Sequence, residues 1–189
     1  SEWEQPTECP AWTVKGIALH ILGDDVSLLS RQRDSATPSV FVYAQSHPGL
    51  TFRELLDGFN EQWVEAARFM STRLVIELLR CTGEWTEAFY SAVDLDELNE
   101  PVGFFGAPGR PSPYWQVIAR EYVERWLHQH QIRRALGRPN LDVAYLAPAA
   151  AAGIRGVAGN LPDLGASAGN TIGFEIPGLG SWLLTRADN

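Results

Sequence analysis

The sequence has no long apolar segment, little positive charge and only two cysteines among its 189 residues. A membrane-spanning helix needs about 20 consecutive apolar residues, and no run here approaches that length. Lys and Arg number 15 against 23 Asp and Glu, which gives a net charge of −8. This balance argues against nucleic-acid phosphates and anionic lipid as partners. We therefore expect no nucleic-acid partner and no membrane association.

The two cysteines, Cys9 and Cys81, are too few for a disulfide framework, and no CxxC pair occurs. This usage is typical of a reducing, cytoplasmic setting. The first ten residues, SEWEQPTECP, do not resemble a signal peptide. Because a Trp and a Pro lie so near the start, as in a connection between elements, we expect further residues to precede Ser1.

Apolar residues recur at helical spacing in four long segments, which predict helices over about 13–33, 51–70, 71–93 and 112–136. Thr51 and Glu54 have the spacing of a capping box, and Gly137 is typical of a helix end. The stretch 34–49 is predicted to be a loop. The Gly- and Pro-rich stretch 94–113 is predicted to be a longer loop, either a lid or binding loop or an inert connection. Cys81 and Trp85 are expected in the core.

The character of the sequence changes after residue 140. The alanine-rich stretch 146–159 predicts a short helix, and residues 171–176 and 181–185 flank a Pro-Gly-Leu-Gly turn as in a β-hairpin. Two strands alone are marginally stable, so the hairpin should pack on helices or belong to a larger sheet. The prediction is a mainly α protein, with a four-helix bundle over 1–140 and a partial α+β segment over 141–189.

The last long helix carries an unusual polar stripe. At 100° per residue, Glu121, Glu124, His128 and Gln131 share one face. Glu124 and His128 are four residues apart, so their Cβ atoms lie about 6 Å from each other, and both side chains can reach one ion at about 2.1 Å. His20, on the apolar side of the first helix, is a candidate third ligand. The alternatives are a hydrogen-bonded core histidine at position 20 and a solvated surface pair at 124 and 128.

Two motifs resemble those of one known family. Residues 3–14 (WEQPTECPAWTV) and 18–23 (ALHILG) are similar to the opening of the mycothiol-dependent maleylpyruvate isomerases, within the DinB/YfiT-like metal-binding helical bundles. Residues 124–139 (ERWLHQHQIRRALGRP) resemble the second signature of that family. The hairpin segment 173–182 (GFEIPGLGSW) resembles the start of a small C-terminal domain often attached to it, which we expect to be cut short at Asn189.

The resemblance implies a divalent metal, most often zinc, held by His20, Glu124 and His128. Three ligands leave a fourth position for water, thiol or substrate, as in catalytic zinc sites. The family uses a low-molecular-weight thiol, mycothiol, which becomes a thiolate when it binds the metal. The implied activity is thiol-assisted isomerisation of a small electrophile, or transfer of the thiol to it. The expected partners are this substrate and the thiol, and a homodimer is left open.

The chain departs from the family pattern at Gln131, where many members have Asp. Glu121 could act as a general base or support a ligand, and Arg120 could hold an anionic substrate; as an alternative, Glu121 is an ordinary exposed residue. His130 and His47 are expected at the surface. Two other functions remain open: a hydrolase whose metal activates water, and a regulatory domain whose metal site is structural or vacant.

Overall fold

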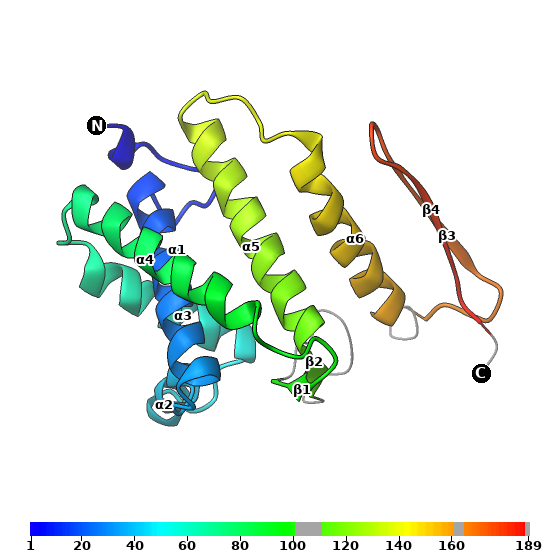
Figure 1. The fold of residues 1–189 in the computed structure, drawn as a ribbon, viewed down its shortest axis with the longest axis horizontal. Coiled ribbons are helices and arrows are strands. Elements are labelled where there is room, and N and C mark those ends of the chain that lie inside the picture. The colour runs from blue at the N-terminus through cyan, green and yellow to red at the C-terminus, as the bar shows by residue number, and fades with distance from the viewer. Residues whose placement is uncertain (101–110, 161–164, 188–189) are drawn as a thin grey trace. The chain divides into compact units, whose positions relative to one another are not determined.

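The computed structural model describes residues 1–100, 111–160 and 165–187, and its fold is mainly α-helical (Figure 1). Two compact units make up the chain. Residues 1–92 and 128–139 form the first unit, and residues 93–127 and 140–189 form the second. The long helix α5 (Tyr114–Ala135) contributes its last turns to the first unit and its earlier turns to the second. The predicted mainly α fold class is confirmed.

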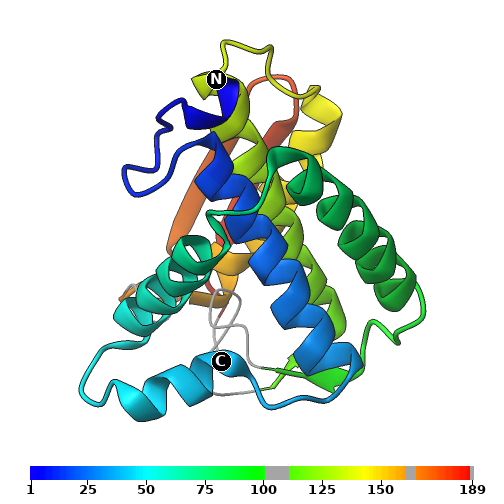
Figure 2. The same ribbon diagram turned by 90° about the vertical axis from the view of Figure 1, so that its left-hand side faces the viewer.

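In the first unit, α1 (Val14–Leu28) lies between α3 (Phe52–Ala67) and α4 (Thr72–Tyr90), as Figure 2 shows. A 3-10 turn, η1 (Glu2–Glu4), precedes α1, and a π-helical turn, η2 (Leu29–Arg33), continues it. The helices bury a common apolar core of small and branched side chains, which consists of Ala18, Leu19, Val64, Ala67 and Val75. Burial of such side chains is the main source of stability in a helical unit.

The contact between α1 and α3 is very close at Gly23. A Cβ at this position would lie 2.5 Å from Cδ1 of Trp63, so a glycine is needed for the Trp63 ring to approach the helix. The Trp63 Nε1 donates a hydrogen bond of 2.7 Å to the Leu19 carbonyl. The N–H of the half-buried indole is therefore satisfied by the backbone of the helix on which the ring packs.

The prediction that Cys81 and Trp85 lie in the core is wrong. Cys81 is exposed, and Trp85 is 53% exposed. The buried face of α4 instead carries Thr82 and Thr86, and the Thr82 hydroxyl donates to the buried Asp25 carboxylate on α1 at 2.8 Å. Apolar periodicity selected the wrong face because part of this contact is a polar pair that hydrogen bonding makes compatible with burial.

The prediction of a loop over 34–49 is also wrong, because it contains α2 (Ser39–Ser46). Two β-branched valines disfavour a helix in this segment, and none of its residues is fully buried. Packing against α3 supplies the stabilisation that the local sequence lacks. The Tyr43 ring meets the Phe59 ring edge-on, with centroids 6.1 Å apart. Tertiary contacts therefore override a weak local preference.

The second unit begins with a two-residue ladder, in which β1 (Leu98–Asn99) pairs antiparallel with β2 (Ser112–Pro113). The intervening residues 101–110 lie outside the described part of the chain, and so does most of the predicted lid or binding loop. The first turns of α5 pack on α6 (Val143–Asn160) through Val117 and Ala152. Burial raises the pKa of Tyr122, whose hydroxyl donates to the Tyr145 carbonyl at 2.8 Å.

The predicted C-terminal helix and hairpin are present. The helix is α6, with Pro148 inside it. The hairpin consists of β3 (Thr171–Ile176) and β4 (Gly180–Thr185), which pair antiparallel, with Phe174 opposite Trp182. Alternate residues of each strand are exposed and half-buried, as expected for strands with one covered face. The sequence pattern therefore located both strands to within a residue.

The end of α5 matches its prediction. Gly137 has φ +60, a left-handed conformation that favours glycine. The Arg138 N–H donates to the Arg133 carbonyl at 2.8 Å, and the Gly137 N–H donates to the Arg134 carbonyl at 3.1 Å. These bonds close the helix as in a Schellman motif, which fixes the last turns of α5 and the side chains that they carry.

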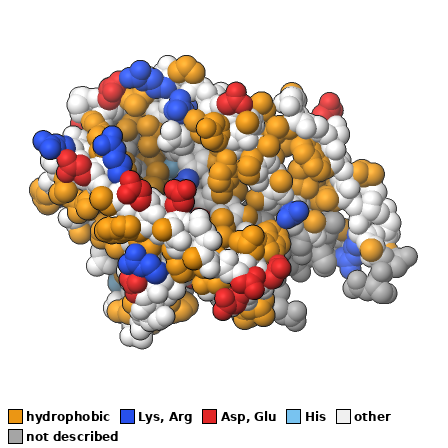
Figure 3. Space-filling model, viewed as in Figure 1, with side chains coloured by type: hydrophobic (Ala, Val, Ile, Leu, Met, Phe, Trp, Pro, Cys, Tyr) orange, Lys and Arg blue, Asp and Glu red, His pale blue; other side chains and the backbone are white. Residues whose placement is uncertain are grey.

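One face of the described surface agrees with the charge balance of the sequence. On the face shown in Figure 3, basic side chains lie among acidic and apolar ones, and the described residues of that face form no broad positive area. Within the described ranges, we find no helix with the length and hydropathy that crossing a bilayer requires.

Candidate metal site

The start of α1 is fixed by local hydrogen bonds. Thr13 caps the helix, and its hydroxyl oxygen accepts from the Gly16 N–H at 3.3 Å. The Thr7 hydroxyl donates to the Trp12 carbonyl at 2.7 Å and accepts from the Cys9 N–H at 3.1 Å. The segment before the helix is therefore folded onto itself through Thr7. This arrangement explains the Thr-x-Cys part of the first motif without a chemical role for the thiol.

Trp12 covers the ring of His20. The two rings stack with centroids 4.7 Å apart and planes 28° apart. The Trp12 Nε1 donates to the Glu61 carboxylate on α3 at 2.7 Å, so the indole is held from its other end. Gly16 leaves room for it, because a Cβ there would lie 2.8 Å from the Trp12 Cβ. Together these contacts fix the half-buried His20 imidazole on one side.

His128, on α5, lies next to His20. The two imidazoles meet edge to face, with centroids 4.8 Å apart and an interplanar angle of 80°. His128 is only 7% exposed, and its Nδ1 lies 2.8 Å from Oε1 of Gln131. Because an amide oxygen can only accept, Nδ1 carries the proton in this arrangement and Nε2 keeps its lone pair. Nε2 is therefore the nitrogen that can offer a lone pair to a metal.

Glu124 lies one helical turn before His128 on the same face of α5. The ligand atoms of His20, Glu124 and His128 all lie within 4.8 Å of one another. Among the residues that the structure describes, these three form the one group of at least three such side chains arranged to hold an ion. The alternative of a solvated surface pair at 124 and 128 does not describe His128, which is buried.

The donor set fits a zinc ion. Two imidazole nitrogens and a carboxylate oxygen are ligands that zinc accepts, and three protein ligands leave a fourth coordination position for another molecule. Tetrahedral ligands about 2.1 Å from zinc lie about 3.4 Å apart, so no pair among the three has to close by more than about 1.4 Å. Small side-chain rotations cover such a distance.

Glu121 is not the exposed residue that the alternative interpretation expected. It is 3% exposed, and its carboxylate accepts from Arg120 and from Arg125, the latter at 3.0 Å. The sequence led us to consider Arg120 as a contact for a substrate anion, and Arg125 was not identified. The spacing of four residues between Glu121 and Arg125 is nevertheless typical of an ion pair on a helix. Glu121 and Arg120 therefore take part in ion pairs on α5.

The other histidines lie outside the metal group. His130 and His47 had been expected at the surface, but both are half-buried. The His47 ring stacks on Tyr43, with centroids 3.9 Å apart. It belongs to a hollow of about 370 Å³ lined by residues of α2 and α3. His47 is therefore accounted for by its packing against Tyr43.

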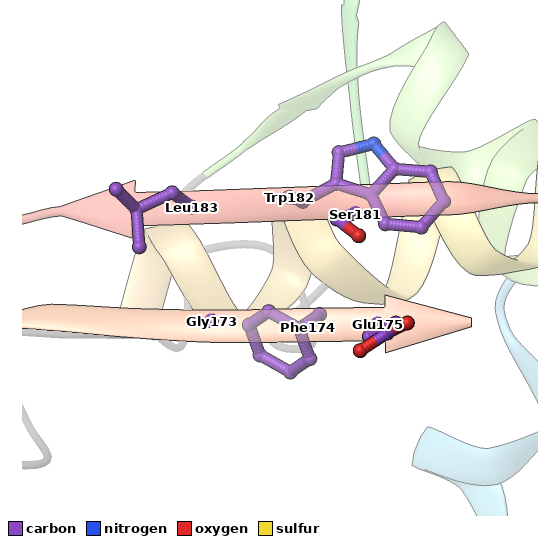
Figure 4. Close-up of a pocket in the computed structure, with 6 residues that line it drawn as sticks. All are labelled: Gly173, Phe174, Glu175, Ser181, Trp182 and Leu183. Atoms are coloured by element: carbon purple, nitrogen blue, oxygen red, sulfur yellow. The ribbon is translucent and has the colours of Figure 1, made fainter. Parts of the chain in front are cut away.

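A second hollow, of about 470 Å³, lies on the hairpin (Figure 4). Six residues of β3 and β4 line it: Gly173, Phe174, Glu175, Ser181, Trp182 and Leu183. This lining contains one carboxylate and no histidine or cysteine. The hairpin hollow therefore lacks the donor set that metal chemistry requires, and the His20, Glu124 and His128 group is the stronger candidate for chemistry.

The comparisons with known proteins point to the same part of the chain. The family model of the mycothiol maleylpyruvate isomerase N-terminal domain matches residues 1–133, which include all three residues of the metal group. Neither the search of curated proteins nor the search of solved structures finds a match. The match covers well over half of the sequence, and it agrees with the resemblance of the two motifs. The chain therefore belongs to the mycothiol maleylpyruvate isomerase N-terminal domain family.

Proposed function

We propose that this protein holds a zinc ion with His20, Glu124 and His128 and uses it to activate a low-molecular-weight thiol, mycothiol, for reaction with a small electrophile. The observation that carries the proposal is the convergence of the three ligand atoms to within 4.8 Å in a chain of this family. When bound, zinc supplies a Lewis acid that lowers the pKa of a coordinating thiol until it is deprotonated near neutral pH.

The chain's own residues have separate tasks in this proposal. His20 and His128 donate neutral nitrogens and Glu124 donates one negative oxygen, so a divalent ion keeps a formal charge of +1 toward the thiol. Trp12 and Gln131 contact the two imidazoles and contribute no ligand atom. Because His128 is buried and His20 half-buried, water screens the charge interactions in the site less than it does at an exposed surface.

A thiolate supports two reactions on a small electrophile. It can add to a conjugated double bond, allow rotation about the resulting single bond and leave again, which changes cis to trans with no net change in atoms. Alternatively, it can remain bonded to the electrophile, which is a transfer. The family supports a thiol partner. We propose isomerisation or transfer as the reaction class, and we keep Arg120 as a proposed contact for an anionic substrate.

Metal content tests the site. The purified protein should contain about one zinc per chain, and His128→Ala should lose most of it, because removal of one of three protein ligands leaves an incomplete site. The matched control is His130→Ala, which removes a histidine two residues further along the same helix and outside the metal group. Equal, tightly held zinc in the wild-type protein and in His128→Ala would refute the ligand assignment.

Cobalt substitution tests the thiol. Titration of the cobalt-loaded protein with mycothiol should produce a thiolate-to-cobalt charge-transfer band in the near ultraviolet, absent from His128→Ala. Turnover of a cis-configured conjugated acid in the presence of mycothiol then tests the reaction. A full complement of metal without a thiolate band would contradict the proposed use of a thiol. Hydrolysis without any thiol would indicate a metal-activated water instead.

A further inference from the structure

We propose that Gln131 is a positioning residue, which holds His128 in the tautomer whose Nε2 faces the ion. The inference rests on the metal site of the proposed function and adds a residue that is not itself a ligand. The contact that carries it is the distance of 2.8 Å between Nδ1 of His128 and Oε1 of Gln131. Gln131 lies three residues after His128 on α5, so the helix itself brings the two side chains together.

The tautomer matters because a neutral imidazole has one N–H and one lone pair. A lone pair on Nε2 requires the proton on Nδ1, and that proton needs an acceptor because His128 is buried. The amide oxygen of Gln131 is this acceptor. If the amide were turned so that its NH₂ group faced Nδ1, Nε2 would carry the proton and could not bind a metal. The orientation of the Gln131 amide therefore controls whether His128 can act as a ligand.

A histidine that binds a metal through one nitrogen donates its other N–H to a carboxylate, carbonyl or water in most metal sites. Loss of such a partner typically lowers metal affinity by about 10- to 100-fold. The amide of Gln131 supplies the acceptor without adding a negative charge. Glutamate at this position would keep the acceptor and could not donate, which makes Gln131→Glu and Gln131→Leu an informative pair.

The first measurement uses metal-free protein. Long-range ¹H–¹⁵N NMR at about pH 8, well above the usual pKa of about 6.5 for histidine, reports which nitrogen of His128 carries the proton. We expect the Nδ1–H form in the wild-type protein and in Gln131→Glu, and a mixture of both forms in Gln131→Leu. The Nε2–H form in the wild-type protein or in Gln131→Glu would overturn the proposal.

The second measurement is zinc affinity by competition with a chelating indicator. Gln131→Leu should bind zinc about 10- to 100-fold more weakly, and Gln131→Glu should bind it at least as tightly as the wild-type protein. The matched control, Gln129→Leu, makes the same change at an exposed position two residues earlier and should leave zinc affinity unchanged.

The outcomes separate this proposal from the proposed function. Unchanged tautomer and affinity in Gln131→Leu would refute the positioning role while the metal site itself stands. Failure of the wild-type protein to bind zinc would refute the proposed function, and the tautomer in the metal-free protein would still decide the role of Gln131. If Gln131→Leu does not fold, Gln131→Glu remains decisive, because weaker zinc binding in that variant contradicts an accepting role for the side chain.

Discussion

At the scale of single residues, neighbouring side chains hold the two imidazoles of the candidate metal group in place. Trp12 stacks on His20 while its indole N–H is bound to Glu61, and Gln131 accepts from His128. Each contact restricts a ring that would otherwise rotate, so the entropy of ordering the ring is lost on folding rather than on metal binding. A proposed metal site that is ordered in this way before binding should hold an ion more tightly than the same ligands on mobile side chains.

A second contact between individual residues predicts a pH dependence. The Thr51 hydroxyl and backbone N–H donate to the Glu54 carboxylate at 2.7 and 2.8 Å, and these bonds lower the pKa of Glu54. A lowered folded-state pKa stabilises the fold above the unfolded-state pKa, and this contribution is lost as pH falls through the folded-state pKa. Glu54→Gln should therefore be less stable than wild type at neutral pH, with a difference that shrinks in acid.

Urea denaturation at several pH values between about 7 and 3 measures this difference. Glu84→Gln is the matched control, because it removes an exposed carboxylate of α4 and should show a smaller and less pH-dependent effect. A Glu54→Gln difference that stays constant across the pH range would contradict the link between the capping box and the ionised carboxylate.

The sequence predicted the three residues of the candidate metal group, which the structure brings within 4.8 Å of one another, but not the contacts around them. His20, Glu124 and His128 were found from helical spacing and family motifs, because both depend on positions along the chain. The roles of Trp12 and Gln131 depend on the directions of side chains and on neighbours that only the folded structure provides. Glu121 shows the same limit. Its spacing predicted the face of α5 on which it lies, but it did not predict that the side chain is buried and bound to two arginines.

At the scale of whole elements, replacement of two helical glycines by alanine should change the stability of the protein in opposite directions. Gly23 on α1 faces the Trp63 ring, and an added Cβ would lie 2.5 Å from Cδ1 of that ring. Gly83, in the middle of α4, has nothing within 4 Å of such a Cβ and is exposed. Gly23→Ala should destabilise the protein by about 1–3 kcal/mol because α3 must shift, and Gly83→Ala should stabilise it by about 0.5–1 kcal/mol.

Thermal and urea unfolding of the two variants provides the comparison, with each substitution acting as the control for the other. Both add one methyl group within a helix, so the intrinsic gain in helix propensity is the same. A stabilising Gly23→Ala would show that α1 and α3 do not approach as closely as the Trp63 contact requires.

The helices themselves show which physical signals the sequence carries. The boundaries of α3 and α5 follow from the Thr51 capping box and from Gly137, which are local features. The buried face of α4 was misassigned because Thr82 and Asp25 form a polar contact within it, and hydrophobic periodicity cannot detect such a pair. The short helix α2 was missed because contact with α3 stabilises it, and the local sequence of α2 does not reveal that contact.

At the scale of the whole molecule, α5 is the element that the two compact units share. It carries the Glu121 ion pairs in the second unit and His128 in the first. The division of the sequence into a domain of residues 1–140 and a segment of residues 141–189 remains a prediction. Since one continuous helix carries Glu121, Glu124 and His128 on successive turns, changes in its position would affect all three together.

Zinc should therefore stabilise the molecule as a whole. Its proposed ligands come from α1 and α5, elements far apart in the sequence, so an ion held by both would link them only in the folded state. At a free zinc concentration of about 100 times Kd the gain is about 2.7 kcal/mol. For a chain of this length, that corresponds to a rise in Tm of roughly 5–10 °C.

Differential scanning fluorimetry with and without zinc measures the shift, and a chelator should reverse it. His128→Ala should show little or no rise in Tm, and magnesium should not replace zinc, because it prefers oxygen ligands to imidazole. An equal rise in the wild-type protein and in His128→Ala would mean that zinc acts at another place on the chain. A rise that needs His128 and disappears with the chelator would instead tie the stability of the fold to the same three side chains that the proposed chemistry uses.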